Sequence, residues 1–282
     1  MKHQFKEKGG EGNIIMLEIE SYFGQNYYQQ KPGFTTHTIA WNTGKSQSVT
    51  IDEVVYEFEA DSILPIMMNQ TFLFENPRDI VAWQFNREFY CIANHDAEVG
   101  CVGFLFFGPS PTMFMKLDAE HLLKMQRIKA LFEEEFESDE DIKGEMLKML
   151  LVRLIINLTR LAKKQYLNVE PDDEKFNLIR QYNLLVEMHF RSQKQVPFYA
   201  GLLNKSPKTV ANIFSLYAKK TPLQVIHDRI IAEAKRLFYF TDKSVKEIAD
   251  NLGFEEVAHF SRFFKNATDM NPSELKKTGA SR

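Results

Sequence analysis

The sequence predicts an α+β protein of two domains: an antiparallel β domain followed by helices, then an all-α domain with two helix-turn-helix units joined by a linker helix. Three observations support this fold class. Short apolar runs between turn residues give way, from Asp118 onward, to apolar residues spaced three and four apart, which is the helical period. Two stretches with the same helix-turn-helix pattern lie 49 residues apart. The net charge changes sign between the two halves.

The composition excludes several classes of protein. The 282 residues are 44% hydrophobic and 26% charged, which is typical of an ordinary globular chain of two domains. The two cysteines, Cys91 and Cys101, are too few for a disulfide framework or a cysteine-rich zinc site, and they indicate a reducing, cytoplasmic location. The longest apolar stretch, Val99–Gly108, has about half the length that a membrane-spanning helix needs. Hydrolase, zinc-protease and nucleotide-loop motifs are missing, so we predict no enzyme activity and no cofactor.

Residues 14 to about 116 are predicted to be rich in β-strands. Apolar or alternating runs of strand length lie between turn signals such as Asn42-Thr43-Gly44-Lys45, and Pro109-Ser110-Pro111 ends the region. This spacing predicts an antiparallel sandwich or barrel. The expected strands lie at residues 35–41, 49–51, 54–58, 63–68, 72–74, 80–85 and 99–107.

Residues 118–168 are predicted to form two helices, separated by the polar run Ser138-Asp139-Glu140-Asp141. The second helix carries apolar residues from Ile142 to Leu161, and its apolar face is broader than a helix resting on one sheet requires. Two interpretations fit this breadth. Either both helices pack on their own β domain, or they form a dimer interface.

A polar run with a proline, residues 169–174, marks the domain boundary, so we assign residues 1–170 to the first domain and 175–282 to the second. Residues 175–282 hold 18 Lys and Arg against 10 Asp and Glu, a net charge of +8. Residues 1–174 hold 17 against 28, a net charge of −11. A basic module joined to an acidic one is typical of a polyanion-binding domain attached to a domain with another task.

The clearest local signals follow Ser244. Ser244 and Glu247 form the S-x-x-E capping box that starts a helix, and Gly253 ends that helix as a residue that accepts positive φ. Another helix follows at once, with phenylalanines on its apolar side. Such a short turn forces the two helices to cross, and the small Ala249 lies at the crossing, which is the helix-turn-helix arrangement.

The same pattern occurs earlier in the chain. Asn204, which also tolerates the left-handed conformation, occupies the place of Gly253, and Ser206-Pro207 caps and opens the next helix. Between the two units, Thr221-Pro222 opens a helix that extends to about Phe240, and its length is roughly 27 Å. Two such units on a rod of this length are predicted to enter successive major grooves, roughly 34 Å apart, on one face of DNA.

These residues resemble a known family. The AraC/XylS family of bacterial transcription regulators has a signature similar to Ile248-Ala249, Leu252-Gly253-Phe254, His259-Phe260-Ser261-Arg262, Phe264-Lys265 and Pro272-Ser273-Glu274, with further similarity at Ser206–Val210 and Arg229–Leu237. The resemblance covers about residues 175–278 and implies a bipartite domain that binds promoter DNA, as a dimer in many members. For the N-terminal half it implies a cupin-like domain for effector binding or dimerisation. The chain departs from the family pattern at Asp269, Lys219 and Leu275-Lys276.

The exposed face of the second helix in each unit is where the resemblance implies contacts with bases. Arg262 is the strongest candidate because its forked guanidinium suits guanine, and a phosphate contact is the alternative. Lys208 can donate to guanine and Asn212 can pair with adenine, whereas Ala211 can at most touch a thymine methyl group. The residues predicted at DNA are Lys208, Ala211, Asn212 and Ser215 in the first unit and Val257, Ala258, His259, Ser261, Arg262 and Lys265 in the second.

Further basic residues are predicted to contact phosphates, and together they should make DNA binding depend strongly on salt. For each of them alone, a solvated surface charge is the alternative. For His259, packing beside a phenylalanine is the alternative to a DNA contact. The predicted phosphate contacts are Lys219, Lys220, Arg236, Lys243 and Lys246.

The N-terminal half offers aromatic candidates for a ligand pocket, with plain core packing as the alternative. Cupin enzymes hold a metal with an H-x-H pair, which this half lacks, so we predict no metal site but retain a pocket without metal. We interpret the two cysteines as buried thiols in preference to a redox pair. The pocket candidates are Trp41, Trp83, Tyr56 and Phe85.

The sequence therefore predicts a cytoplasmic, homodimeric transcription regulator of the AraC type. Its expected partners are double-stranded promoter DNA, a small-molecule effector and RNA polymerase, and no membrane. Activation is the expected mode, with repression as the alternative. Two other classes stay open: an architectural DNA-binding protein without effector, and a cupin enzyme fused to a regulatory domain.

Overall fold

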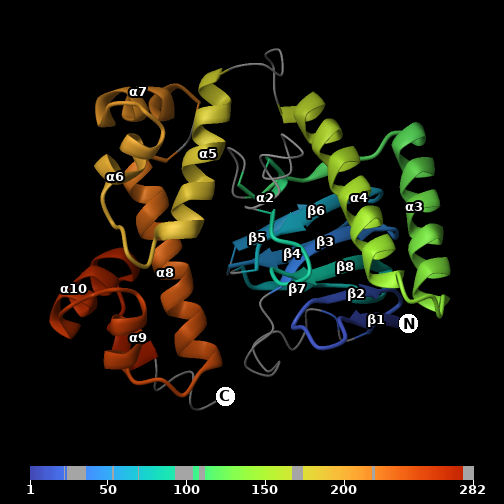
Figure 1. Cartoon of the computed structure of the whole chain (residues 1–282), viewed down its shortest axis with the longest axis horizontal. Helices are drawn as coiled ribbons and strands as arrows, with labels where there is room; N and C mark the ends of the chain where they lie inside the picture. The colour runs from blue at the N-terminus through green and yellow to red at the C-terminus, as the bar shows by residue number, and fades with distance from the viewer. Residues whose placement is uncertain are drawn as a thin grey trace. The chain divides into compact units, whose positions relative to one another are not determined.

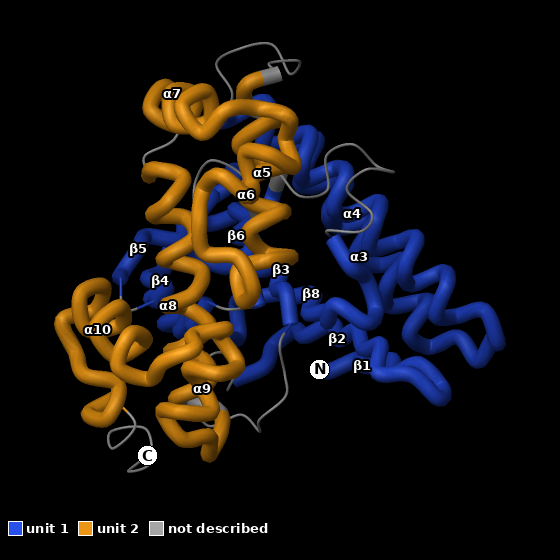
Figure 2. The backbone as a smooth tube through the Cα atoms, turned by 60° about the vertical axis from the view of Figure 1, so that its left-hand side comes forward, with its two compact units in different colours: residues 1–27, 34–106, 111–171 blue, residues 28–33, 107–110, 172–282 orange. Residues whose placement is uncertain are grey.

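A computed structural model describes residues 1–21, 23, 36–52, 54–68, 70–92, 104–107, 112–166, 174–217 and 220–275. The chain forms two compact units, which are described separately (Figure 2): the N-terminal unit comprises residues 1–27, 34–106 and 111–171, and the C-terminal unit comprises residues 28–33, 107–110 and 172–282. None of the described helices is long and apolar enough to cross a membrane.

The N-terminal unit contains two antiparallel sheets (Figure 1). The larger has the order β1-β2-β8-β3-β6-β9 and the smaller β5-β4-β7, with antiparallel pairing throughout. Val49 and Ile51 of the smaller sheet share one apolar core with Leu64 and Ala82 of the larger. The strands are β1 (Lys2–Lys6), β2 (Asn13–Leu17), β3 (Thr36–Asn42), β4 (Gln47–Ile51), β5 (Val54–Phe58), β6 (Ser62–Ile66), β7 (Phe72–Phe74), β8 (Ile80–Asn86) and β9 (Met115–Lys116).

Between residues 35 and 85, each predicted strand begins and ends within two residues of the observed one. At the strand starts, the largest difference is at β4, which begins at Gln47 where the sequence predicts a start at residue 49. The strand predicted at 99–107 is wrong for its last residues, because Phe104–Phe107 forms the short helix α2, and residues 99–103 lie outside the described residues. A short apolar run has no period that separates strand from helix. The edge strands β1 and β9 were not predicted, since one is polar and the other has two residues.

Two long helices, α3 (Ala119–Glu137) and α4 (Lys143–Tyr166), follow the sheets. Asp118 caps α3 through its side chain. On the inner side of α3, Phe132 packs against Trp83 of β8, with ring centroids 5.8 Å apart. The interpretation that the helices pack on their own β domain is therefore confirmed for the inner side.

The C-terminal unit consists of helices over its described residues. A single core joins Val210 and Phe214 of the first helix-turn-helix unit, Ile230 of the linker helix, and Phe260 and Phe264 of the second unit. Both units are thus built around the linker helix α8. The helices are α5 (Glu174–His189), α6 (Val196–Leu202), α7 (Pro207–Tyr217), α8 (Pro222–Phe240), α9 (Val245–Asn251) and α10 (Val257–Thr268).

Candidate DNA interface

The two helix-turn-helix units turn in the same way. After α6, Asn204 has a φ of 52°, and the next N–H donates to the Ala200 carbonyl at 3.0 Å. After α9, Gly253 has a φ of 68°, and the next N–H donates to the Ala249 carbonyl at 3.0 Å. Both turns are Schellman motifs, as the equivalence of Asn204 and Gly253 in the sequence predicts. Both alanines are fully buried where the helices cross.

Side-chain caps fix where the following helices begin. Ser206 accepts the N–H three positions further on at 3.1 Å, at the start of α7. Thr221 and Gln224 form a capping box at α8, and Ser244 and Glu247 form one at α9. Each cap satisfies backbone donors that the helix itself leaves unpaired, so the register of the exposed face is set by local chemistry.

Helix α7 has a buried side formed by Val210 and Phe214, which are at most 1% exposed. The Ser215 hydroxyl donates to the Asn212 carbonyl at 2.8 Å, so its proton is held by its own helix. Lys219, which follows α7, lies outside the described residues. The side chains predicted to read DNA from this helix, all exposed, are Lys208, Ala211, Asn212 and Ser215.

Two basic side chains of helix α10 lie on its exposed face. Phe260 and Phe264 are fully buried, which turns Arg262 and Lys265 outward. Neither Arg262 nor Lys265 has a polar partner within the part of the chain that the structure describes, so both are available to DNA. A guanidinium and an ammonium on one exposed face can bind a guanine edge and a neighbouring phosphate.

The other predicted residues of α10 differ in exposure. Ala258 and His259 are exposed, and the His259 ring lies edge-on to Phe254, with centroids 5.6 Å apart. Ser261 is half-buried. Val257 is also half-buried and packs against the domain core, which leaves it less surface for a base than the sequence suggested.

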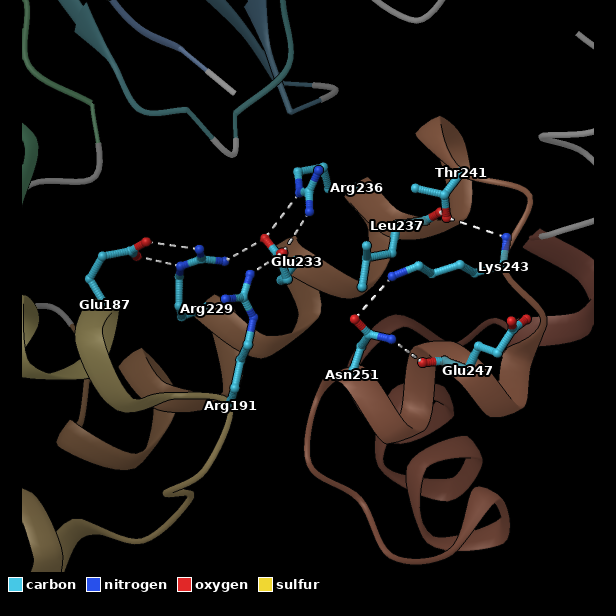
Figure 3. Close-up of polar contacts among 10 residues, drawn as sticks. All are labelled: Glu187, Arg191, Arg229, Glu233, Arg236, Leu237, Thr241, Lys243, Glu247 and Asn251. Carbon is cyan, nitrogen blue, oxygen red and sulfur yellow. Dashed lines mark hydrogen bonds and ion pairs between the residues drawn. The ribbon is translucent and has the colours of Figure 1, made fainter. Parts of the chain in front are cut away.

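The basic residues around α8 and α9 have different surroundings. Lys246 is exposed and has no polar partner among the described residues. Lys220 pairs with Asp228 at 2.5 Å. Lys243 donates to the Asn251 side chain at 3.0 Å, as Figure 3 shows. Exposed pairs of this kind are weak in water, so both lysines can exchange these partners for phosphate.

Arg236 belongs instead to a buried charge network (Figure 3). Its guanidinium donates to both carboxylate oxygens of Glu233, at 2.8 and 3.1 Å. Glu233 is 2% exposed and also accepts from Arg191 at 2.9 Å and from Arg229 at 3.3 Å, while Arg229 pairs with Glu187 through two guanidinium nitrogens. Burial by itself would raise the pKa of Glu233, but the hydrogen bonds and charges of the arginines lower it to about 2.

One exposed residue of α7 was missed by the sequence reasoning. Leu216 is 72% exposed and directly follows Ser215 on the outer side of the helix. The signal was present, because Leu216 falls outside the three- and four-residue spacing of Val210 and Phe214. A branched aliphatic side chain at this place can contact a thymine methyl group.

The geometry agrees with comparisons to known proteins. A family profile described as a helix-turn-helix domain matches residues 199–278, from α6 to beyond α10. The HTH-type transcriptional activator RhaS of Enterobacter sp. (strain 638) is 22% identical over 156 residues, 54% of each chain. The arabinose operon regulatory protein of Escherichia coli (strain K12) is 24% identical over 135 residues, 48% of this chain and 46% of its own. Residues 199–278 therefore form a helix-turn-helix domain of the AraC/XylS type.

The chain spans about half the length of the curated relatives that it matches. Among solved structures, ToxT from Vibrio cholerae is 15% identical and aligns over 96% of this chain and 98% of its own, with a TM-score of 0.45.

The N-terminal unit, which precedes the AraC/XylS-type domain, contains a hollow of about 370 Å³ lined by residues of the larger sheet, of the segments that follow or connect its strands, and of α3. Trp41 is 3% exposed, and its indole nitrogen has no hydrogen-bond partner in the described part of the chain. Lys129 pairs with the buried Glu18 at 2.8 Å, and Arg78 is exposed. The lining residues are Glu18, Ile19, Trp41, Thr43, Asp61, Arg78, Val81, Leu122, Gln126 and Lys129.

The other pocket candidates belong to the core. Trp83 and Phe85 are fully buried, and Tyr56 packs against the apolar core between the sheets, so the alternative of plain core packing holds for these three. Cys91 is half-buried, and Cys101 lies outside the described residues. The described residues contain no group of His, Cys, Asp and Glu side chains suited to a metal ion.

Proposed function

We propose that this protein is a sequence-specific transcription regulator that binds promoter DNA with both helix-turn-helix units in adjacent major grooves. The observation that carries this proposal is the pair of equivalent units on one core, each presenting an exposed second helix. Helix α8 between them has 19 residues, or about 28 Å, which is close to the roughly 34 Å between successive major grooves. The family of the C-terminal domain and the names of its relatives support the same conclusion.

In this proposal Arg262 reads a guanine, because it is exposed, forked and without a competing carboxylate among the described residues. Lys208 and Asn212 read bases from α7, with Leu216 as a thymine contact. Phosphates are contacted by Lys220, Lys243 and Lys246, and by Lys219 as the sequence predicts. Arg236 drops out of the phosphate contacts, since its guanidinium is engaged by Glu233. The remaining groove residues are Ala211, Ser215, Val257, Ala258, His259, Ser261 and Lys265.

The test is DNA selection from random duplexes with the full chain, repeated at two salt concentrations. An enriched site with two short blocks about one helical turn apart is the expected result. Binding that enriches no sequence and disappears with salt would indicate an architectural role driven by charge. Failure of the folded protein to bind any duplex would refute the proposal.

We also propose that the N-terminal unit acts as a cupin-like effector domain and forms the homodimer through the outer side of α3 and α4. Ile142, in the turn just before α4, and Met146 and Met149 of α4 recur at helical spacing and are 65%, 41% and 66% exposed. Leu123 and Leu131 of α3 are 47% and 37% exposed. An apolar stripe on the outside of a helical pair is typical of a helix–helix interface between subunits. Sedimentation velocity tests the proposal, and a monomer at micromolar concentration would contradict it.

The hollow beside Trp41 is the proposed effector site. Its polar and apolar lining fits a small ligand that carries both hydrogen-bonding groups and an apolar face. We propose that the protein acts in the cytoplasm as an activator that contacts RNA polymerase, since its relative RhaS is named a transcriptional activator. A thermal-shift screen of metabolites tests for the effector, and the absence of any stabilising compound would favour a regulator without one.

A further inference from the structure

Between α5 and α6 the chain forms a short segment, residues 190–195, that we call the brace. It precedes the first helix-turn-helix unit in sequence but contacts the turn of the second. The Lys194 ammonium donates to the Gly253 carbonyl at 2.6 Å and to the Arg191 carbonyl at 3.2 Å. It also lies over the Phe254 ring, 4.7 Å from the centroid. One side chain therefore joins the α5–α6 connection to the α9–α10 turn.

The two carbonyls that Lys194 binds lie just past the C-terminal ends of α5 and α9, where Arg191 and Gly253 follow the last helical residues. Helix C-termini carry partial negative charge, so one ammonium stabilises both ends. Lys194 is half-buried, and this partial burial lowers the pKa of its amine below the ordinary value. Cation–dipole contacts of this kind gain strength as water is excluded.

The backbone of the brace lies in close contact with the turn of the second unit. A Cβ atom at Gly253 would lie 2.0 Å from the Arg191 carbonyl oxygen, so only glycine permits this approach. The left-handed φ of Gly253 adds the same requirement. Gly253 therefore serves both the turn of its own unit and the contact with the brace.

The brace is also tied to the linker helix and to the first unit. The Arg191 side chain donates to Glu233 of α8 at 2.9 Å, as Figure 3 shows. The Tyr199 hydroxyl of α6 donates to the Gln193 carbonyl at 2.7 Å. The first unit, the linker helix and the second unit thus meet at one short segment.

From these contacts we infer that the brace fixes the distance and rotation between the two reading helices, with Lys194 as the positioning residue. A linker helix alone allows bending and twisting along its length, whereas a second connection removes that freedom. The inference rests on the proposed DNA-binding function and adds the determinant of spacing. The protein should therefore accept one separation between its two DNA blocks and reject others.

The experiment uses the full chain and the two-block site obtained by selection. Affinities are measured for this site, for versions with one base pair inserted or removed between the blocks, and for single-block duplexes. One base pair moves the second block by about 3.4 Å and rotates it by about 34°, so the wild type should lose about tenfold in affinity. In Lys194→Met, which keeps an unbranched side chain but removes the charge, this penalty should fall below about threefold, with single-block affinity unchanged.

Three controls separate the outcomes. Lys194→Arg retains the charge and should retain the spacing penalty of the wild type. Lys235→Met removes a lysine of α8 that has no polar partner among the described residues, and it should leave the spacing penalty unchanged. Arg191→Met, which breaks the tie to Glu233 through a largely exposed side chain, replaces Lys194→Met if that variant does not fold. An unchanged penalty in the folded brace variants would overturn the inference. A wild type that selects no two-block site would overturn the proposed function itself.

Discussion

Replacing Glu233 with glutamine should destabilise the C-terminal unit by about 3 kcal/mol near neutral pH. The side chain is 2% exposed, and its carboxylate accepts hydrogen bonds from Arg191, Arg229 and Arg236. Glutamine has nearly the same shape, so the change removes the charge and leaves the packing. It also points two amide hydrogens toward guanidinium groups that are themselves donors.

The magnitude follows from the charge state of the carboxyl group. The pKa of Glu233 falls from 4.5 to about 2 in the folded protein. A difference of this size corresponds to about 3 kcal/mol of stabilisation when the group is ionised. Removing one partner of a buried ion pair costs a similar amount, about 3–5 kcal/mol, and here Arg229 keeps Glu187 as a second partner, which favours the lower end.

The pH dependence has a defined sign. Because the folded-state pKa lies below the ordinary value, Glu233 stabilises the fold above about pH 4.5, and this contribution is lost as the pH falls toward about 2. The glutamine side chain of the variant cannot titrate. The difference in unfolding free energy between wild type and variant should therefore be full at pH 7 and shrink progressively below about pH 4.5.

Urea unfolding read by two probes provides the assay. Both tryptophans, Trp41 and Trp83, lie in the N-terminal unit, so their fluorescence reports that unit alone. Far-ultraviolet circular dichroism also reports the helical C-terminal unit. The substitution should shift the dichroism transition and leave the fluorescence transition in place. A dichroism shift below about 0.5 kcal/mol at pH 7, or a difference that stays constant down to about pH 3, would refute the reasoning.

The remaining predictions concern DNA and assembly. Arg262→Ala should cost about 1–3 kcal/mol of binding free energy and relax the preference at one base pair. Lys246→Ala should lower the affinity for all DNA sites equally and reduce the slope of log affinity against log salt concentration by about 1. DNA titrations at several salt concentrations distinguish the two outcomes. Met149→Glu should convert the proposed dimer to a monomer in sedimentation velocity, because it places a charge at the most exposed residue of the apolar stripe of α4, and a dimer that persists would exclude this face. Uracil lacks the methyl group of thymine, so replacing one thymine of the first block with uracil should lower the DNA affinity of the wild type at one position. The DNA affinity of Leu216→Ala should not change at that position, and an equal loss in both proteins would remove Leu216 from the interface.

The helix-turn-helix geometry could be predicted because its determinants are local. Capping boxes such as Ser244 with Glu247 act over three residues, and Asn204 and Gly253 mark their turns by conformational preference alone. The exposed faces of α7 and α10 then followed from the helical period.

The charge network and the brace could not be predicted in the same way. Glu233 meets Arg191 across 42 positions of sequence, and Lys194 meets Gly253 across 59. No local pattern marks such pairs, so the sequence does not indicate that Arg236 also binds Glu233. Leu105 and Phe106 of α2 show the same limit, since an apolar run this short indicates burial but has no period that separates strand from helix.

The two equivalent turns differ in how freely they can vary. Asn204 is exposed, whereas Gly253 lies against the Arg191 carbonyl oxygen. In a library of point variants, position 204 should therefore accept glycine and aspartate, which tolerate the left-handed conformation, and position 253 should accept nothing but glycine. The first turn therefore tolerates substitution at position 204, whereas the second turn requires glycine at position 253. Retargeting the protein to new promoters by exchange of helices should accordingly succeed more readily in the first unit, where substitutions need not preserve a contact with a distant part of the chain.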